Sequence, residues 1–511
     1  MMMMNKKGWF VFKNKENTKK TDLPEKKKKR KHKLRENIES IAIAVALAFA
    51  IRYFVVEAFK IPTGSMAPTL LGVHKDVSCP NCNWSFYADR QSETATCPNC
   101  QFEINTSLYC TACNGKIRYN WPPWLWRKGT CSGCQTKIAW KDLSNRVTHG
   151  GNRILVNKFW YTFTKPKRWD VMVFVYPFYD IKCKNCSVLI PDVKWRDSLS
   201  CPRCGSTKFS KKKKNYIKRL IGLPGEKLQI VNGDIYINDK IQRKPEKAQN
   251  ALWMPVYNGN YTIHEDVVPT WIIDNEFWNV TEKSLSLNNL NKDNSGTSLI
   301  TFGQQISDQN GYNNRSGENE MGDVKISLDV TPAKGSHRLE FVLEKNEEVF
   351  SASIPIENIA NKCTLSRSNS VVVEKDFHLT PDQTHKIEFS NVDHIVSLKV
   401  NDVNVFSFDY DNGGVPAFRS FDSSKVRFGG TNAKVKYDNI QIYHDIYYTS
   451  LSGDTYGTFQ PIQLKEKDYF VLGDNSRNSN DSRVWKFVPE KNVVGKAFFV
   501  FWPLENINFI K

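Results

Sequence analysis

Twelve of the thirteen cysteines fall in six C-x-x-C pairs, which form three sets of four. Within a set, 14 or 17 residues separate the two pairs. Knuckle sequences such as C-P-N-C and C-S-G-C contain turn residues that let backbone N–H groups face thiolate sulfurs. Because four thiolates at this spacing suit tetrahedral zinc, the pattern predicts about three structural zinc ions, each in a zinc ribbon. The predicted ligands are Cys79, Cys82, Cys97 and Cys100; Cys110, Cys113, Cys131 and Cys134; and Cys183, Cys186, Cys201 and Cys204.

The same cysteines could form disulfides instead, because the compartment predicted below is not cytosolic. A redox role for a single pair is disfavoured, since all six pairs occur in ribbon-like sets. Each set supplies four cysteine ligands, and no histidine or aspartate completes a site that keeps one ligand position open. The metal is therefore expected to be structural. The remaining cysteine, Cys363, is interpreted as a buried core residue.

A second candidate site consists of a serine and a lysine. Ser65 follows an extended stretch, Lys218 lies between apolar residues, and the loop 473–483 is rich in polar side chains. A serine nucleophile needs a neighbouring base that is neutral, and no histidine occurs in these segments. A lysine can serve if burial lowers its pKa, because desolvation disfavours the ammonium form. Individually these signals are weak.

Together the segments resemble the bacterial type I signal peptidases, or leader peptidases, of the S26 family. The motifs that carry the resemblance are P-T-G-S-M-A-P-T-L (62–70), G-N-R-I-L-V-N-K-F (151–159), P-K-R-W-D-V-M-V-F (166–174), Y-I-K-R-L-I-G-L-P-G-E (216–226) and G-D-N-S-R-N-S-N-D-S-R (473–483). They are long, and they occur in the order found in the family. The resemblance covers residues 55–80, 150–180, 215–250 and 460–503, and it leaves out the cysteine sets and residues 255–446.

The resemblance implies a role for each motif residue. The implied roles are Ser65 as nucleophile, Lys218 as general base, the Thr63 hydroxyl and the Ser65 N–H as oxyanion hole, Ser479 as the residue that orients the lysine amine, Asp481 and Arg483 as a supporting salt bridge, and Ile61 and Met66 as lining of the substrate pockets. Two departures are visible: Ser476-Arg477 stands where the family usually has Arg-Asp, and Trp169 stands where it usually has Gly. Neither touches the serine–lysine dyad, so they put loop details in doubt.

On this resemblance the protein is expected to be a serine endopeptidase. It would cleave N-terminal signal peptides from exported preproteins after small residues, through an acyl-enzyme and with no cofactor for catalysis. The substrate would lie extended beside a strand, with alternate side chains in shallow apolar pockets. Two alternatives are a binding protein on a degenerate peptidase scaffold and a self-cleaving Ser/Lys protease of a transcriptional repressor. The presence of Ser65, Lys218 and Ser479 argues against the first alternative, and the lack of a DNA-binding segment argues against the second.

Residues 41–59 are apolar apart from Arg52 and Glu57, and as a helix they would cover about 28 Å. Of the net charge of +19, +11 lies in residues 1–35, directly before this segment. The positive-inside rule then predicts a single-pass protein of the inner (plasma) membrane, with a cytoplasmic N-terminus and its catalytic domain on the outer face. A cleaved signal peptide and a buried core helix are the alternatives. The small excess of charge elsewhere argues against a nucleic-acid partner.

The composition is that of a globular protein, 40% hydrophobic and 24% charged. Alternating apolar runs and Asn-, Asp- and Gly-rich turns predict a mainly β fold. Residues 227–237 are expected to form a hairpin with a tight turn at Asn232-Gly233. Residues 255–446 are expected to form an inserted antiparallel sandwich of short alternating strands, among them 395–400, 403–408 and 435–443. Its last strand resembles those of concanavalin/laminin-G-like jelly rolls, and its ligand is unknown.

The predicted organisation places four segments of a catalytic core between the other elements. In chain order we expect a basic tail (1–38), a transmembrane helix (39–59), the first core segment with the nucleophile (60–78), two zinc ribbons (79–149), the second core segment (150–182), the third zinc ribbon (183–204), the third core segment with the general base (205–254), the sandwich insert (255–446) and the fourth core segment (447–511).

Overall fold

The computed structural model describes most of the chain. The described residues are 36–45, 55–110, 112–113, 115–119, 128–139, 143–194, 198–264, 269–290, 296–308, 312, 319–357, 361–418, 423–448 and 456–510. The chain divides into two compact units, Met1–Val56 and Glu57–Lys511. In the first unit, residues 36–45 are helical.

Across the described residues, the structure contains no helix with the length and apolar character that a membrane crossing requires. Residues 46–54, in the middle of the predicted span, lie outside the described residues, as does the basic tail 1–35. The predicted end of the span at residue 59 is wrong, because Val56–Lys60 forms strand β1. This strand pairs with β10, and Phe59 packs against an apolar cluster that includes Ile61. Sheet pairing and this packing therefore decide the conformation of these residues.

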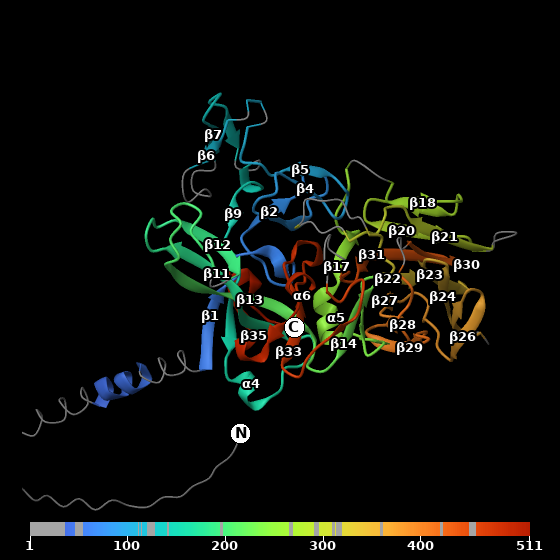
Figure 1. The fold of residues 1–511 in the computed structure, drawn as a ribbon. Coiled ribbons are helices and arrows are strands. Elements are labelled where there is room, and N and C mark those ends of the chain that lie inside the picture. Colours follow the sequence, from blue (N-terminus) through green and yellow to red (C-terminus); the bar gives the residue numbers. More distant parts are fainter. Residues whose placement is uncertain are drawn as a thin grey trace, which may run out of the picture. The chain divides into compact units, whose positions relative to one another are not determined.

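The largest sheet of the second unit carries Lys218 and is antiparallel wherever its register is given (Figure 1). Its strands, in spatial order, are β1, β10 (Arg153–Asn157), β35 (Val493–Trp502), β11 (Val171–Cys183), β13 (Phe209–Gly222), β33 (Asp468–Leu472) and β34 (Val488–Pro489), with β12 (Leu189–Lys194) beside β11 and β36 (Asn508–Phe509) beside β35. The long strands β11 and β13 extend past the end of β35 and pair with each other from Tyr179↔Lys213 to Cys183↔Phe209. Apolar residues of β10, β11 and β35 pack with Met66 and Leu70 into one buried cluster.

A four-stranded sheet lies next in sequence. It consists of β14 (Lys227–Val231), β15 (Asp234–Ile237), β16 (Lys240–Ile241) and β32 (Ile462–Gln463). The predicted hairpin is confirmed, with Val231 opposite Asp234. Both turn residues, Asn232 and Gly233, have positive φ (52° and 86°), as a two-residue turn of this hand requires.

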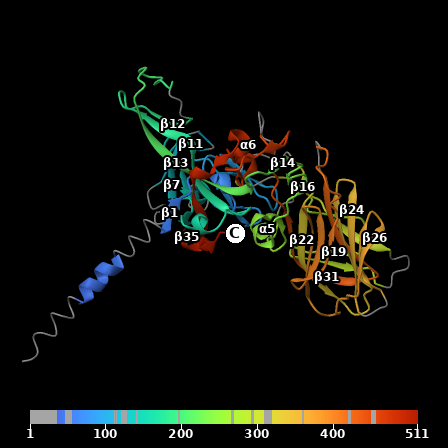
Figure 2. The same ribbon diagram turned by 60° about the horizontal axis from the view of Figure 1, so that its bottom comes forward.

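Residues 255–446 contain two further antiparallel sheets that share one apolar core (Figure 2). One sheet has β19 (Trp278–Val280), β20 (Ser284–Asn288), β31 (Lys434–His444), β22 (Val324–Pro332), β27 (His385–Val392), β28 (Ile395–Val400) and β29 (Val403–Asp409), with β17 (Met254–Asn258) beside β31. The other has β18 (Trp271–Ile273), β21 (Thr297–Phe302), β30 (Ser424–Thr431), β23 (Arg338–Lys345), β24 (Glu348–Pro355), β25 (Cys363–Arg367) and β26 (Ser370–Lys375). We call this two-layered region the insert.

Several details of the insert were predicted from the sequence. The strands expected at 395–400, 403–408 and 435–443 are confirmed as β28, β29 and β31. Cys363 is fully buried in the shared core, as expected. The likeness of the insert to one particular class of jelly roll stays a prediction.

The segments around the first two cysteine sets form small sheets of short strands. These are β3-β2-β9 (Ser85–Asp89, His74–Ser78, Thr148–His149), β4-β5 (Thr94–Thr96, Glu103–Asn105) and β6-β7-β8 (Ile117–Tyr119, Lys128–Cys131, Lys137–Ala139). The described helical segments of the second unit are short: η2 (Gly64–Met66), α4 (Trp160–Phe163), α5 (Glu246–Leu252), η3 (Ser476–Asn478), α6 (Ser482–Trp485), η4 (Glu490–Asn492) and η5 (Leu504–Asn506).

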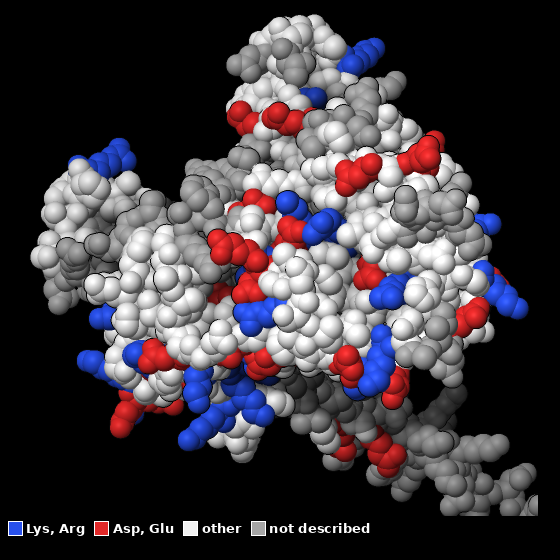
Figure 3. Space-filling model, turned by 90° about the vertical axis from the view of Figure 1, so that its right-hand side faces the viewer, with Lys and Arg blue, Asp and Glu red and all other residues white. Residues whose placement is uncertain are grey.

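Charged residues of both signs are intermixed on one face of the second unit. Figure 3 shows this face, on which Lys and Arg side chains lie among Asp and Glu side chains on a mostly uncharged surface. This mixture agrees with the excess of only +8 over residues 36–511.

We expect Gly233→Ala to destabilise the β14–β15 hairpin. An added Cβ would lie 2.3 Å from Tyr447 Cδ2, and the residue has a φ of +86°. Backbone strain costs about 1–2 kcal/mol, and displacing the tyrosine ring adds about 1–3 kcal/mol. The urea midpoint of unfolding measures the loss.

Gly335→Ala is the matched control for this prediction. Gly335 also has a positive φ (84°), but an added Cβ would meet nothing within 4 Å. This variant should show only the strain. Equal midpoints for the two variants would mean that the contact with Tyr447 contributes nothing.

Candidate active site

Ser65 lies in the short turn η2 between two extended residues. Thr63 and Ala67 flank the turn with ψ values of 154° and 149°. Met66 and Ala67 are fully buried, and Ser65 itself is half-buried. The buried residues hold the turn on the core, while the serine side chain faces the site.

Lys218 approaches Ser65 from strand β13. Its Nζ donates a hydrogen bond to Ser65 Oγ at 2.6 Å and a second one to the Ile217 carbonyl at 3.1 Å. Only 3% of the lysine is exposed. Burial lowers the pKa of Lys218 to about 8, although the nearby Asp481 and Asp474 carboxylates act in the opposite direction. A substantial fraction of this amine is therefore neutral near pH 8 and can accept a proton.

The loop 473–483 contacts the turn η2 through Asn475. Its backbone N–H donates to the Ser65 carbonyl at 3.1 Å, and its Nδ2 donates to the Gly64 carbonyl at 3.1 Å. At Gly473 the loop comes so close that an added Cβ would lie 2.4 Å from the Ser65 carbonyl and 2.2 Å from Ser479 Oγ. Residue 473 therefore has to be a glycine in this arrangement.

Two buried ion pairs surround the lysine. Arg483 contacts Asp481 through Nε and Nη2 at 3.0 and 2.8 Å, and neither side chain is exposed. Although burial favours the neutral acid, the Arg483 guanidinium holds the pKa of the Asp481 carboxyl below its usual value. Arg219, next to Lys218, contacts Asp474 through Nε and Nη2 at 2.8 and 2.7 Å, again without exposure. Both pairs are two-pronged, which is the strongest geometry for such contacts.

The structure brings some of the predicted site residues together and leaves others apart. Ser65 with Lys218, and Asp481 with Arg483, are in direct contact. Ser479 is buried close by. Besides the Arg483 guanidinium, a hydrogen bond from the Ser479 side chain helps to keep the pKa of the Asp481 carboxyl low despite its burial.

The predicted oxyanion and pocket residues lie beside and beneath the turn η2. Thr63 is exposed and its side chain caps nothing in η2, so its hydroxyl is accessible. Ile61 and Met66 lie in the apolar cluster beneath the turn, with exposures of 3% and 0%. Their roles in binding substrate stay predictions.

The two departures from the family pattern have physical counterparts. Trp169 adopts a φ of +74°, a conformation that a glycine would adopt without strain. Its ring is buried in a core cluster, Lys244 Nζ lies 5.6 Å from the ring centroid, and its carbonyl accepts from Arg219 Nη1 at 3.0 Å. Arg477 pairs with Asp308 of the insert at 3.2 Å.

Sequence reasoning missed Arg219, Asp474, Asn475 and the two insert residues Asp308 and Tyr312. The role of Arg219 could have been predicted from its position. Neighbouring residues of a strand point to opposite faces, so a strand that is buried at Lys218 also buries Arg219 on its other face. A buried guanidinium needs an acidic partner. The insert residues carry no comparable signal. Their contacts join segments more than 160 residues apart.

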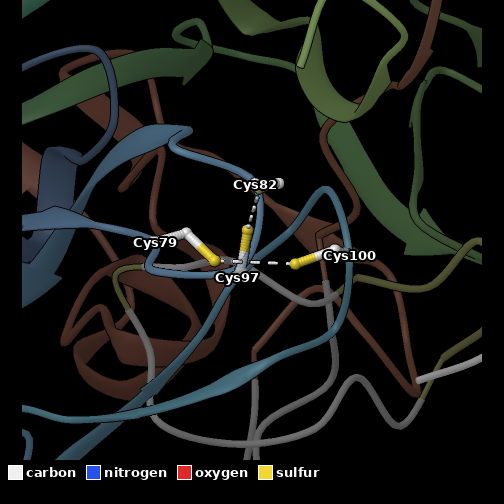
Figure 4. A group of neighbouring side chains, drawn as sticks. All are labelled: Cys79, Cys82, Cys97 and Cys100. Carbon is white, nitrogen blue, oxygen red and sulfur yellow. Dashed lines mark hydrogen bonds between the residues drawn. The ribbon is translucent and has the colours of Figure 1, made fainter. Parts of the chain in front are cut away.

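The twelve paired cysteines form three clusters of four sulfurs. In the first, Cys79 Sγ lies 3.6 Å from Cys100 Sγ, and Cys82 Sγ lies 3.6 Å from Cys97 Sγ (Figure 4). The corresponding distances in the other two clusters are 3.4–3.7 Å. A disulfide would need about 2.05 Å, whereas Zn–S bonds of about 2.3 Å in a tetrahedron put sulfurs about 3.8 Å apart. The sulfur arrangement fits a tetrahedral metal.

The backbone around the cysteines also fits such a metal. In five of the six C-x-x-C turns, the residue after the second cysteine has a positive φ and donates its N–H to the carbonyl of the first cysteine. These residues are Asn83, Gln101, Gln135, Ser187 and Gly205; the sixth, Asn114, lies outside the described residues. The repeated turn directs the thiol groups of each pair to one point.

The first cluster differs from the other two in its surroundings. All four of its cysteines are buried, and Asn99 beside it accepts a hydrogen bond from the Asn258 N–H at 2.7 Å. Trp84 stacks on Tyr261 at 5.5 Å. In contrast, Cys113, Cys134 and Cys204 of the other clusters are exposed.

Residues 34–76, 143–300 and 424–502, more than half of the chain, match the family described as signal peptidase, peptidase S26. The chain belongs to this S26 family. The matched ranges leave out the first two cysteine clusters and 301–423 of the insert, but they extend into the insert at both of its ends. The gap between the matched ranges, 301–423, is therefore shorter than the insert predicted at 255–446.

Several curated proteins match shorter stretches of the chain. A probable signal peptidase I-2 of Synechocystis sp. is 35% identical over 74 residues, which are 14% of this chain and 33% of that protein. A signal peptidase I of Buchnera aphidicola subsp. Baizongia pistaciae is 32% identical over 149 residues, 27% of this chain and 46% of that protein. This chain therefore spans less than half the length of these relatives.

A solved structure also aligns with a portion of the chain. The carbohydrate binding module CBM66 from Bacillus subtilis is 12% identical, and 35% of this chain covers 97% of it with a TM-score of 0.25. A TM-score this low supports no functional assignment.

Proposed function

We propose that this protein is a membrane-anchored serine endopeptidase that removes N-terminal signal peptides from exported preproteins after small residues. The observation that carries the proposal is the 2.6 Å contact between Lys218 Nζ and Ser65 Oγ in a site where burial lowers the pKa of the lysine to about 8. Membership of the S26 family supports the choice of substrate.

The dyad would act in two steps. Neutral Lys218 takes the Ser65 proton while Oγ attacks the scissile carbonyl, and the ammonium then protonates the leaving amine. Water, deprotonated by the same lysine, hydrolyses the acyl-enzyme. The Ser65 N–H and the Thr63 hydroxyl would stabilise the developing oxyanion, a contribution that is typically several kcal/mol.

The other predicted residues would support this chemistry. The Asp481–Arg483 pair fixes the end of the catalytic loop, because Asp481 also accepts from the Gly473 N–H at 3.1 Å. Ser479, which is buried and hydrogen-bonded to Asp481, would orient the lysine amine. A lipid bilayer is the proposed second partner, through residues 39–55 as a single-pass anchor with its N-terminus in the cytoplasm.

We expect Ser65→Ala and Lys218→Ala each to lower the kcat for a detergent-solubilised preprotein by about 10³-fold or more, because either change removes the dyad. Cleavage assays on gels measure the rate. The matched control is Lys212→Ala, which removes an exposed lysine of the same strand β13. Near-normal turnover by the Lys218 variant would refute the assignment of the base.

The pH dependence of kcat/KM should report the titration of Lys218. The base has to be neutral, and its pKa is lowered to about 8, so the rate should fall as the pH drops through about 8. A lysine in water would place this limb near about 10.4. A profile with its midpoint there would contradict a buried base.

His74 is the group most easily confused with the lysine in such a profile. Despite its burial, a hydrogen bond to Asp76 raises the pKa of His74 above its usual value. Because the limb near pH 8 is assigned to Lys218, His74→Gln should leave it in place. A limb that disappears in this variant would belong to the histidine.

We further propose that the three cysteine clusters are structural zinc ribbons. The non-bonded sulfur distances and the repeated turn support metal over disulfides, and the segments have too little apolar sequence to form a core unaided. The zinc would hold the ribbon turns together. None of the cysteines contacts Ser65 or Lys218 in the described structure, so the catalytic steps need no metal.

Protein purified without added zinc should contain about three zinc ions per chain by elemental analysis. A chelator should remove about two of them quickly, because the second and third clusters have exposed cysteines and the first has none. Cys79→Ser should delete the slow fraction and Cys204→Ser a fast one. A zinc content near zero, with no free thiols after denaturation, would establish disulfides instead.

A further inference from the structure

The insert contacts the nucleophile turn through one tyrosine. Tyr312, between β21 and β22, is 1% exposed and packs with Ala67 and Leu71. Its ring lies on Gly64, where an added Cβ would be 1.9 Å from Cε1. Its hydroxyl donates to the Val73 carbonyl at 3.2 Å, and its own carbonyl accepts from the Asp89 N–H at 3.2 Å. The ring is thus fixed against the residue before Ser65.

A second insert residue contacts the catalytic loop. Asp308 Oδ1 accepts from Arg477 Nη1 at 3.2 Å, and both side chains are at most 15% exposed. Asn319 holds the same carboxylate through its N–H and its Nδ2, at 3.2 and 2.7 Å. Arg477 is two residues after Asn475, which binds the Ser65 and Gly64 carbonyls. The insert therefore holds the loop that in turn holds the nucleophile.

The insert also contacts the core away from the site. Lys244 of the core already binds Asp393 and Asp445 of the insert at 2.6 and 2.8 Å, with all three side chains buried. Gln249 adds a hydrogen bond of 2.6 Å to Asp445. These contacts attach the insert to the core at a second place, away from Tyr312 and Asp308.

We propose that Tyr312 and Asp308 are positioning residues for the Ser65–Lys218 pair. Tyr312 would fix Gly64 from one side, and Asp308 would fix Arg477 and the catalytic loop from the other. The turn that contains Ser65 and the loop 473–483 are about 400 residues apart in the chain, so only tertiary contacts keep them in register. Displacing a reacting atom by about 1 Å can cost about 100-fold in rate. The proposal rests on the peptidase function proposed above.

The test compares variants of the full chain in detergent. Tyr312→Ala should lower kcat about 100-fold while KM stays within about twofold, because the substrate does not contact the ring. Tyr312→Phe, which keeps the ring, should recover most of this loss. Asp308→Asn should lower kcat about tenfold, and adding Arg477→Gln should cost no more, because the two residues act as one pair.

A second readout isolates the nucleophile from preprotein binding. The rate at which a small fluorophosphonate labels Ser65 should fall in parallel with kcat. The matched controls are Tyr437→Phe, which removes a buried hydrogen bond of 2.9 Å to the Gly429 carbonyl, and Glu348→Gln, which breaks an ion pair of 2.6 Å with Arg367. Both controls lie in the insert and should change thermal unfolding without changing kcat.

The outcomes separate this inference from the proposed function. Wild-type kcat in Tyr312→Ala and Asp308→Asn, or a loss confined to KM, would overturn the positioning role. So would a loss that the two controls share. A wild type that cleaves no preprotein but labels at Ser65, with slower labelling in the variants, would refute the substrate and keep the positioning role. A wild type that is not labelled at all would overturn both.

Discussion

The amine of Lys218 can act as a base only while it is neutral, yet two carboxylates lie close enough to favour its charged form. Each of these carboxylates is held by an arginine in a fully buried pair, Asp481 with Arg483 and Asp474 with Arg219. Buried ion pairs contribute little to stability on average, because desolvation offsets their attraction. Here each arginine balances the negative charge of its carboxylate, so that burial of Lys218 has the larger effect on its pKa. The loop 473–483 has to supply both acids and one arginine, which explains its dense polar sequence.

The large additions to the chain leave this arrangement undisturbed because of where they join it. The first two cysteine clusters lie between β2 and β9, which pair at His74↔His149. The third lies between β11 and β13, which pair at Cys183↔Phe209. The insert begins with β17 and ends with β31, which pair at Met254↔His444. In every case the chain leaves the core and returns to it at adjacent points. An addition whose ends are already adjacent costs the core little, since closing a longer loop adds only a slowly growing entropy term.

The sequence predicted most reliably what local patterns determine. The Asn232-Gly233 hairpin and the alternating strands β28, β29 and β31 needed only turn chemistry and period-two patterning. The contact of Ser65 with Lys218 was expected from long motifs, not from any local rule. The end of the apolar span was misjudged because hydropathy does not register strand pairing. The contact of Tyr312 with Gly64 could not be predicted, because nothing near either residue indicates a partner about 250 positions away.

Strand β35 separates β10 from β11 in the large sheet, although it lies more than 300 residues later in the sequence. Until residues 493–502 are available, β10 and β11 each present an unpaired edge, and apolar residues of β11 next to Lys218 have no neighbour on that side. Long-range pairing of this kind is slow, and open edges invite association with other chains. A newly made molecule therefore passes through a stage at which the turn η2, the cysteine segments and the insert are present but the large sheet is incomplete. Any cellular factor that shields exposed strand edges would act at that stage of its folding.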